Sequence, residues 1–532
     1  MRIIDLAFGP ERSRVAAVGF LCGALMLSFG FEGPIVARGV EAARIGADRP
    51  DLAIALLVVT TGYVWAGITT VRRVTENLLL AVMAGRRRLI EATLHSDLAT
   101  IERVGSETVL STLTASPDDI LATAPLLARA FRTGCYIIGT LVVLATLAWQ
   151  LFAAVLAILL TILAALALSH GAVMSALREA GNLEAATRQD LRATVLGFKE
   201  LRLNAVRRRQ FMAGLHKRVA ETLTAFGRAN RRQTLVFVLQ STATLMASGI
   251  CIFVVPNAMP DANPVTMIAA AVLMSNISLA LLRDIPLLIR GEAAAIDMER
   301  LNSVLRPVRE MATQPGDETP PRQAMPLTLD RVCYQYLEDG DGPGFAFGPV
   351  SLDFQPGTVT FVLGGNSSGK TTLIKLLAGL YRPGFGDIQL GDEIATQTGL
   401  RESVSAIFAD PYVFDRLYGW PDTDPAIVNG LLHEMGIGSR IRFADGQFST
   451  TDLSTGQRKR LAWVVAMIEA RPILVLDEWA ADQDPEFREY FYHALLPGLR
   501  TAGKTIIAVT NDDRYYHMAD RLIRLEDGLV VS

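Results

Sequence analysis

Long apolar runs alternate with charged stretches over the first half of the chain. Six of these runs approach the roughly 20 residues that a transmembrane α-helix needs. They are Val15–Phe31, Leu52–Val71, Leu126–Trp149, Leu151–Ser169, Leu235–Val255 and Val265–Leu282. The buried helices of a soluble protein can imitate one or two such runs, but not six in succession. The pattern therefore predicts an all-α, six-helix transmembrane domain over residues 1–290.

Lysine and arginine are concentrated in two long polar stretches, Arg72–Pro125 and His170–Gln233, and are missing from the short turn Pro256–Asn263. Basic loops stay on the cytoplasmic side of a membrane. We therefore expect a multi-pass protein of the inner (cytoplasmic) membrane, with both termini and both long loops in the cytoplasm. Because these loops are poor in glycine and proline, we predict that they continue the membrane helices as α-helical hairpins.

Polar residues inside the last two apolar runs are candidates for a substrate path. Asn276 ranks first among them, followed by Ser275 and Ser248. Polar groups within membrane segments are often functional, although serine also serves as a small packing residue between helices. The pattern does not identify a substrate.

The character of the chain changes after Arg290. Residues 291–325 form a linker, in which a charged helical stretch is followed by a segment rich in proline and glycine at 314–321. Residues 326–532 alternate short β-branched strands with helical stretches, which predicts a soluble α/β domain. The fold class is thus multidomain, a helical membrane domain followed by an α/β domain.

The composition argues against two classes of function, nucleic-acid binding and a cysteine metal site. The 532 residues carry a net charge of −3, so no basic field indicates nucleic acid as a partner. The basic run Arg207–Arg209 is better explained by membrane topology and a solvated helix face than by nucleic-acid binding. The four cysteines stand far apart, without the spacing of a metal site.

A glycine-rich stretch follows the predicted strand Val359–Leu363 and precedes a predicted helix. Its residues fit the P-loop pattern and are the expected nucleotide-binding set: Gly364, Gly365, Asn366, Ser367, Ser368, Gly369, Lys370, Thr371 and Thr372. Such a turn directs backbone N–H groups and a helix N-terminus at phosphates. Lys370 would reach the β- and γ-phosphates of ATP, and the hydroxyl of Thr371 would hold Mg²⁺.

Two further motifs follow at the expected places. Ser454 can cap a helix that begins after Leu453. The apolar strand that starts at Ile473 ends in two carboxylates, Asp477 and Glu478. In a P-loop ATPase the first carboxylate would hold Mg²⁺ and the second would polarise the attacking water.

These motifs together resemble those of ATP-binding cassette (ABC) exporters, in which a membrane domain precedes one nucleotide-binding domain. The resemblance implies that Tyr336 stacks on adenine. It also identifies the cassette signature, in which threonine replaces one of the usual glycines: Leu453, Ser454, Thr455, Gly456 and Gln457. The runs Gly364–Asn366, Phe414–Leu417 and Asp477–Pro485 are similar to those of the subfamily that exports cyclic peptides and peptide siderophores, of the syringomycin and pyoverdine type.

Two positions depart from the family pattern. Asp410 stands where a glutamine is usual, in the loop that contacts the metal and the attacking water. Asn511 stands where a switch histidine usually follows the last strand, Thr505–Thr510. We therefore expect Glu478, Asn511 and Asp410 to be the catalytic residues, with Thr371, Asp477 and Asp410 as the metal ligands.

One cassette per chain implies a homodimer, because the resemblance places each ATP between the P-loop of one cassette and the signature of another. The predicted function is ATP-driven export of a peptide natural product by alternating access. Beyond the second copy, the expected partners are membrane lipid and the peptide. Two alternatives remain open: a lipid or glycolipid flippase, and a membrane sensor whose cassette hydrolyses ATP weakly. An importer fits the membrane-first order less well.

Overall fold

The computed structural model describes residues 48–147, 149–250, 285–305, 325–336 and 344–531, together with a few isolated positions before residue 47 and residue 253. The chain divides into two compact units. One unit comprises the described parts of Met1–His95 and Val104–Arg306, and the other comprises Ser96–Arg103 and the described parts of Pro307–Ser532.

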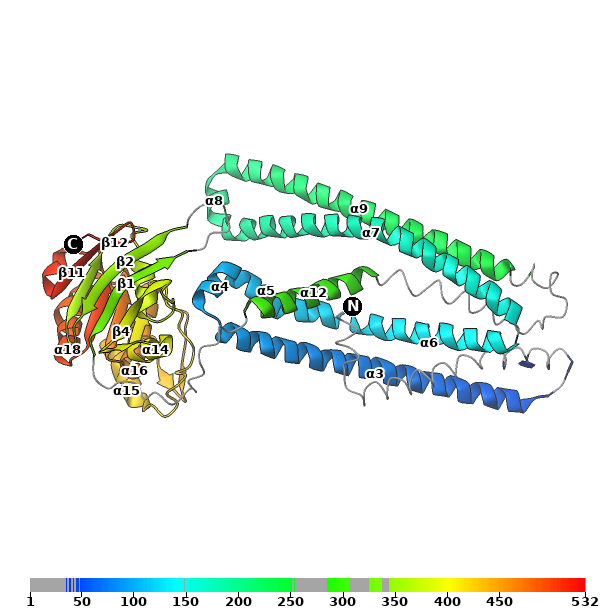
Figure 1. The fold of residues 1–532 in the computed structure, drawn as a ribbon, viewed down its shortest axis with the longest axis horizontal. Helices are drawn as coiled ribbons and strands as arrows, with labels where there is room; N and C mark the ends of the chain where they lie inside the picture. The colour runs from blue at the N-terminus through cyan, green and yellow to red at the C-terminus, as the bar shows by residue number, and fades with distance from the viewer. Residues whose placement is uncertain are drawn as a thin grey trace. The chain divides into compact units, whose positions relative to one another are not determined.

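The first unit is built from long helices (Figure 1). Their bounds are α3 Pro50–Leu94, α5 Ser106–Leu121, α6 Ala124–Leu147, α7 Trp149–Leu196, α8 Phe198–Leu203, α9 Ala205–Gly249 and α12 Ile285–Val304. The second to fifth apolar runs lie wholly or largely on α3, α6, α7 and α9. The first and sixth runs, including Ser275 and Asn276, lie outside the described residues. Within the described part of the chain, one helix, α3, is long and apolar enough to cross a membrane by length and composition.

The polar loops continue the apolar helices, as the sequence predicted. α7 runs without a break for 48 residues and packs along α9. Thr187 of α7 and Thr222 of α9 share a hydrogen bond of 2.9 Å between their hydroxyls, and Arg228 donates to Glu179 at 2.8 Å. A second cluster joins α3, α5, α6 and α12 through buried apolar side chains, with Leu78 and Ile120 at its centre.

The second unit is an α/β domain organised around a six-stranded sheet of order β12-β11-β3-β10-β9-β6. Its strands are β3 Val359–Leu363, β6 Val404–Ile407, β9 Ile473–Asp477, β10 Thr505–Val509, β11 Arg521–Glu526 and β12 Leu529–Val530. All neighbours pair in parallel except the edge strand β12. β3, β9 and β10 are buried throughout, as expected of parallel strands covered on both faces.

An antiparallel sheet of order β2-β1-β4-β5 completes the α/β domain. Its strands are β1 Leu327–Gln335, β2 Ala346–Phe354, β4 Phe385–Leu390 and β5 Glu393–Ile394. The helices that carry or flank the site are α13 Lys370–Leu377, α16 Thr455–Glu469 and α17 Pro485–Tyr490. α14 Gln397–Ser403, α15 Pro425–Glu434, α18 Leu496–Thr501 and the small β7–β8 hairpin, Phe443–Ala444 and Gln447–Phe448, surround them.

The short helix α4, Leu98–Val104, belongs mostly to this second unit. Leu98 and Ala99 pack against its apolar core. The carboxylate of Glu102 accepts hydrogen bonds from the ammonium group of Lys375, at 2.7 Å, and from the hydroxyl of Tyr381. A segment far away in sequence is therefore anchored directly on the nucleotide-binding fold.

Candidate nucleotide-binding site

The parallel order of the sheet brings the predicted motifs together. The P-loop follows β3, Asp477 and Glu478 end β9, Asn511 follows β10, and Asp410 follows β6. Because the carboxyl ends of parallel strands lie at one edge of a sheet, these segments come together at that edge, the usual ligand-binding position in open α/β sheets.

The P-loop has a backbone that needs glycine at both ends. Gly364 has φ +151°, and a Cβ there would lie 2.4 Å from the carbonyl oxygen of Leu525. Gly369 has φ +100°, and a Cβ there would meet the ring of Phe347 at 2.8 Å. By contrast, a Cβ on Gly365 would meet nothing within 4 Å. The loop is thus closely packed on the protein side and open at Gly365.

Polar groups of the P-loop are arranged for an anion. The buried ammonium group of Lys370 donates to the carbonyl oxygens of Gly364, at 2.9 Å, and Gly365, at 2.6 Å. The hydroxyl of Ser368 is buried and has no hydrogen-bond partner within the described residues, a costly state for a polar group. A phosphate on this loop would satisfy it, since the loop also supplies the N-terminus of α13.

Tyr336 lies beside the P-loop helix. Its hydroxyl and that of Thr372 are 3.1 Å apart, and its ring meets that of Tyr381 edge-on with 5.9 Å between centroids. The ring of Tyr336 is half-buried. The hydroxyl contact places Tyr336 beside Thr372 of the P-loop helix, and the expected stacking of its ring on adenine stays a prediction.

The two carboxylates at the end of β9 differ in environment. Burial raises the pKa of the Asp477 carboxyl, and the charge of Glu478 raises it further, while Lys459 and Lys370 act in the opposite direction. Glu478 adopts a left-handed backbone conformation with φ +47°, which is uncommon for a residue other than glycine. Its N–H donates to the carbonyl oxygen of Val509 at 3.2 Å.

This donor set fits a magnesium ion. Mg²⁺ prefers oxygen ligands and is often held by one or two carboxylates with phosphate and water. Thr371 and Asp477 would supply the protein oxygens, and a divalent cation beside Asp477 would favour the ionised carboxylate that burial and Glu478 disfavour. Within the described residues no cluster of three or more His, Cys, Asp or Glu side chains could hold a metal.

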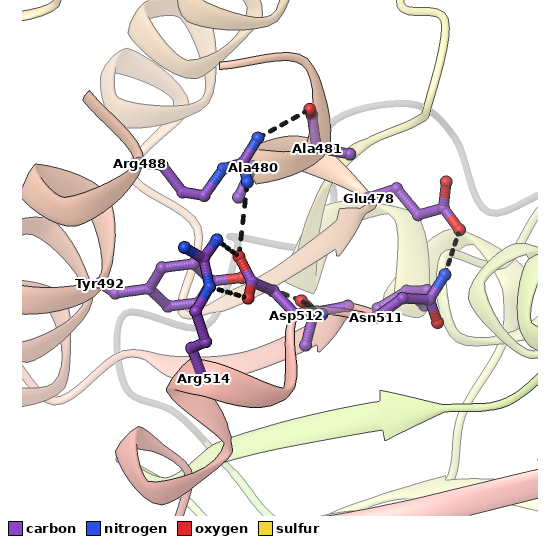
Figure 2. Close-up of a pocket in the computed structure, with 10 residues that line it drawn as sticks. Glu478, Ala480, Ala481, Arg488, Tyr492, Asn511, Asp512 and Arg514 are labelled. Atoms are coloured by element: carbon purple, nitrogen blue, oxygen red, sulfur yellow. Dashed lines mark hydrogen bonds and ion pairs between the residues drawn. The ribbon is translucent and has the colours of Figure 1, made fainter. Parts of the chain in front are cut away.

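Asn511 reaches the carboxylate of Glu478. Its side-chain amide donates to Oε1 of Glu478 at 3.3 Å (Figure 2). A pocket of about 300 Å³ adjoins this pair and is lined on its other side by Arg488, Tyr492 and Arg514. The residue in place of the switch histidine is therefore in contact with Glu478.

The signature segment forms a capped helix start. Ser454 accepts a hydrogen bond from the N–H of Gln457 at 3.3 Å, and its own N–H donates to the Gln457 side chain at 3.2 Å. This reciprocal pair is a capping box. Leu453 is buried, and Thr455 begins α16. A Cβ on Gly456 would lie 2.6 Å from the carbonyl oxygen of Asp482, so the helix approaches the segment after Glu478 closely.

Asp410 differs from the other expected site residues in its surroundings. Its side chain is 83% exposed and accepts from Nη2 of Arg458 at 3.1 Å. Arg458 follows the signature glutamine directly. Asp410 thus links the loop after β6 to the signature helix, and its predicted part in catalysis and metal binding stays a prediction.

Two residues that sequence reasoning missed hold the site together. Arg488 of α17 donates to the carbonyl oxygen of Ala481, at 3.1 Å, and contacts Asp512 at 3.5 Å (Figure 2). It also donates to the carbonyl oxygen of Gln483 at 3.2 Å. Lys459 of α16 is buried and donates to the carbonyl oxygen of Glu478. A basic residue on the otherwise apolar face of a helix was the one available signal for Lys459.

Ser248, a predicted path residue, lies half-buried on α9 in the helical unit. It belongs to a different unit from the nucleotide site, and the two are described separately.

Comparison with known proteins finds matches to ABC transporter proteins. Residues 347–481 match the model of the ABC transporter family. The chain is 33% identical over 468 residues to the ATP-binding protein SyrD of Pseudomonas syringae pv. syringae, an alignment that covers 84% of this chain and 82% of SyrD. It is 30% identical over 225 residues to the mycobactin import ATP-binding/permease protein IrtB of Mycolicibacterium thermoresistibile, an alignment that covers 38% of this chain and 38% of IrtB.

Among solved structures, a bacterial Atm1-family ABC exporter with ATP bound superposes with a TM-score of 0.74 at 17% identity. The match covers 98% of this chain and 94% of that exporter chain. The similarity confirms the predicted fold class, a helical domain followed by an ABC ATPase domain.

Proposed function

Because the chain belongs to the ABC transporter family, in which ATP hydrolysis drives transport, we propose that it exports a peptide natural product from the cytoplasm as a homodimer in the inner membrane. Cyclic, lasso-like and siderophore peptides are the cargo classes in question. The similarity to SyrD carries this proposal, since it extends over both the helical and the nucleotide-binding part.

The relatives differ in what they support. The match to IrtB, whose name denotes mycobactin import, covers 38% of this chain and carries no argument about the direction of transport. The run from Asp477 to Pro485 supports a cargo of the peptide class, because it resembles that of cyclic-peptide and peptide-siderophore exporters. Ser248, Ser275 and Asn276 are the proposed path residues in the helical domain.

In the proposed cycle each residue has a separate task. Tyr336 stacks on adenine, the P-loop and Lys370 hold the phosphates, and Thr371 and Asp477 hold Mg²⁺, which neutralises phosphate charge when bound. Glu478 accepts a proton from the attacking water while Asn511 orients its carboxylate. Asp410 is proposed to guide the water and the metal from the loop after β6.

The proposed dimer follows from the position of the signature. Ser454 and Gly456 stand at the N-terminus of α16 with backbone N–H groups that the capping box satisfies only in part. We propose that they meet the γ-phosphate on the P-loop of a second copy. Closure of the two cassettes on ATP would then turn the helical domains outward, and hydrolysis would release them.

The test is transport by the purified protein in proteoliposomes with outward-facing cassettes. We expect Mg-ATP to drive uptake of a cyclic lipopeptide or peptide siderophore from a defined panel, and the same peptide to stimulate ATPase activity. Glu478→Gln serves as the matched inactive control. Stimulation and movement of labelled lipids alone would establish the flippase instead, and ATP binding without stimulated turnover would support a sensor.

A further inference from the structure

Lys459 is a buried cation that the proposed catalytic steps do not use. It lies in α16 two residues after the signature glutamine, Gln457, and is 1% exposed. Its ammonium group donates to the carbonyl oxygen of Glu478 at 2.7 Å and pairs with Oδ2 of Asp482 at 2.6 Å. A lysine is kept charged in an interior only when such partners compensate its lost hydration.

The hydrogen bond from Lys459 is accepted by a residue, Glu478, whose backbone is in a left-handed conformation. Glu478 has φ +47°, a conformation that is strained in a residue other than glycine and persists only when its surroundings fix it. Its N–H is bound to Val509, at 3.2 Å, and its carbonyl oxygen accepts from Ala481, at 3.3 Å, as well as from Lys459. The charged ammonium group of Lys459 therefore helps to fix the backbone of Glu478, and this backbone sets the direction of the Glu478 side chain.

Two hydrogen bonds of opposite direction connect Lys459 of the signature helix with the segment Glu478–Trp479. The indole N–H of Trp479 donates to the backbone carbonyl of Lys459 at 3.0 Å, while the Lys459 side chain donates to Glu478. Gly456, one turn earlier on α16, lies against Asp482 with no room for a side chain. A movement of the signature helix would thus be passed to the backbone of Glu478.

We propose that Lys459 is a positioning residue that couples the signature helix to the catalytic glutamate of the same chain. The coupling rests on the proposed function, in which Ser454 meets the ATP of the partner while Glu478 acts on the ATP of its own chain. Lys459 then connects the two nucleotide sites of the dimer, so that closure of the signature on one ATP sets the hydrolytic geometry at the other.

The experiment compares variants of the full-length protein in nanodiscs. Lys459→Met keeps the length and apolar stem of the side chain but removes the donor. We expect kcat for ATP to fall by up to about 10²-fold, the typical result of a misplaced catalytic group. KM for ATP and the affinity of a fluorescent ATP analogue should stay within about twofold, since binding rests on the P-loop. The Hill coefficient for ATP should move to one.

Lys504→Met is the matched control. Lys504 also donates to a backbone carbonyl, that of Arg471, at 2.6 Å, but at the amino ends of β9 and β10, away from the site. If Lys459 only stabilised the fold, the two variants would lose equal amounts of melting temperature and of kcat. That result would overturn the proposal. We expect Lys504→Met to lose stability and keep kcat and the Hill coefficient.

A second variant covers a failure of Lys459→Met to fold. The pair Lys459→Gln with Asp482→Asn removes both charges, so no buried ion is left unpaired, and keeps an amide donor facing Glu478. We expect it to retain more kcat than Lys459→Met and than Lys459→Leu with Asp482→Asn, which has no donor. Equal kcat in the two neutral pairs would refute the positioning role. Transport and ATPase of the wild type in the same nanodisc and liposome preparations report separately on the proposed function.

Discussion

Nδ2 of Asn511 lies 3.3 Å from Oε1 of Glu478 and donates a hydrogen bond to it. The two residues follow the carboxyl ends of neighbouring parallel strands, β10 and β9. An asparagine side chain that reaches the carboxylate of Glu478 can orient it, but asparagine never carries a charge near pH 7, whereas histidine can. Asparagine in place of the family's usual histidine therefore preserves the contact with Glu478. It cannot present to the γ-phosphate the positive charge that a histidine can carry.

Asn511→His should raise basal ATPase activity. Histidine is longer and can donate to the phosphate while still contacting Glu478. The gain is on the order of tenfold if one added transition-state hydrogen bond contributes about 1.4 kcal/mol. Steady-state ATPase of both proteins in one nanodisc preparation measures it, with Asn511→Ala as the control that lacks any donor. Equal or lower rates for the histidine variant would show that asparagine already serves this site fully.

Removing the charge of Glu478 should separate hydrolysis from binding. Glu478→Gln keeps the size of the side chain and an oxygen that accepts from Asn511, but it cannot take a proton from water. We expect turnover to fall by about 10²–10⁴-fold, with Mg-ATP affinity unchanged because Lys370 and the P-loop remain intact. Single-turnover hydrolysis and equilibrium nucleotide binding measure the two effects. A fall of less than threefold would mean that another residue is the base.

The sequence predicted most of the nucleotide site because its motifs are local. The P-loop, the capped start of α16 and the strand ending in Asp477 and Glu478 each depend on neighbours within a few residues. Parallel pairing of β3, β10 and β9 then brings them together, and buried β-branched strands of this kind are recognisable from their composition.

The rest depends on contacts between distant segments. Glu102 meets Lys375 across 273 positions of sequence, and no local pattern in α4 indicates that it belongs to the ATPase unit. Arg488 looks like an ordinary charged residue of a short helix, yet it binds backbone carbonyls of the segment after Glu478. Partners of this kind are set by tertiary packing, which periodicity and propensity do not encode.

Disrupting the signature should abolish turnover while leaving nucleotide bound. Ser454→Arg places a long cation where Ser454 caps α16 and faces the proposed partner site. We expect ATPase activity to be lost and the fluorescent analogue still to bind at the P-loop, in a protein that remains dimeric in nanodiscs.

Asp424→Arg is the control for cap loss alone. Asp424 caps α15 by accepting from the N–H of Ala426 at 2.8 Å, so its substitution costs a comparable ~1 kcal/mol of helix stability without touching the signature. A catalytically competent monomer, or equal activity in the two arginine variants, would contradict a signature that acts across a dimer.

Arg488 should matter more than its neighbour Arg514, although both contact Asp512. Arg488 is 25% exposed and also binds the carbonyls of Ala481 and Gln483, whereas Arg514 is 64% exposed. Arg488→Met leaves those carbonyls without their charged donor, at a cost of about 1–3 kcal/mol, and frees the segment that follows Glu478. We expect a lower melting temperature and a kcat reduced several-fold at unchanged ATP affinity. Arg514→Met, the matched control, removes an exposed ion pair that contributes little to stability and should leave kcat unchanged. Equal effects of the two substitutions would show that Arg488 acts through its ion pair with Asp512 and not through its hydrogen bonds to the backbone after Glu478.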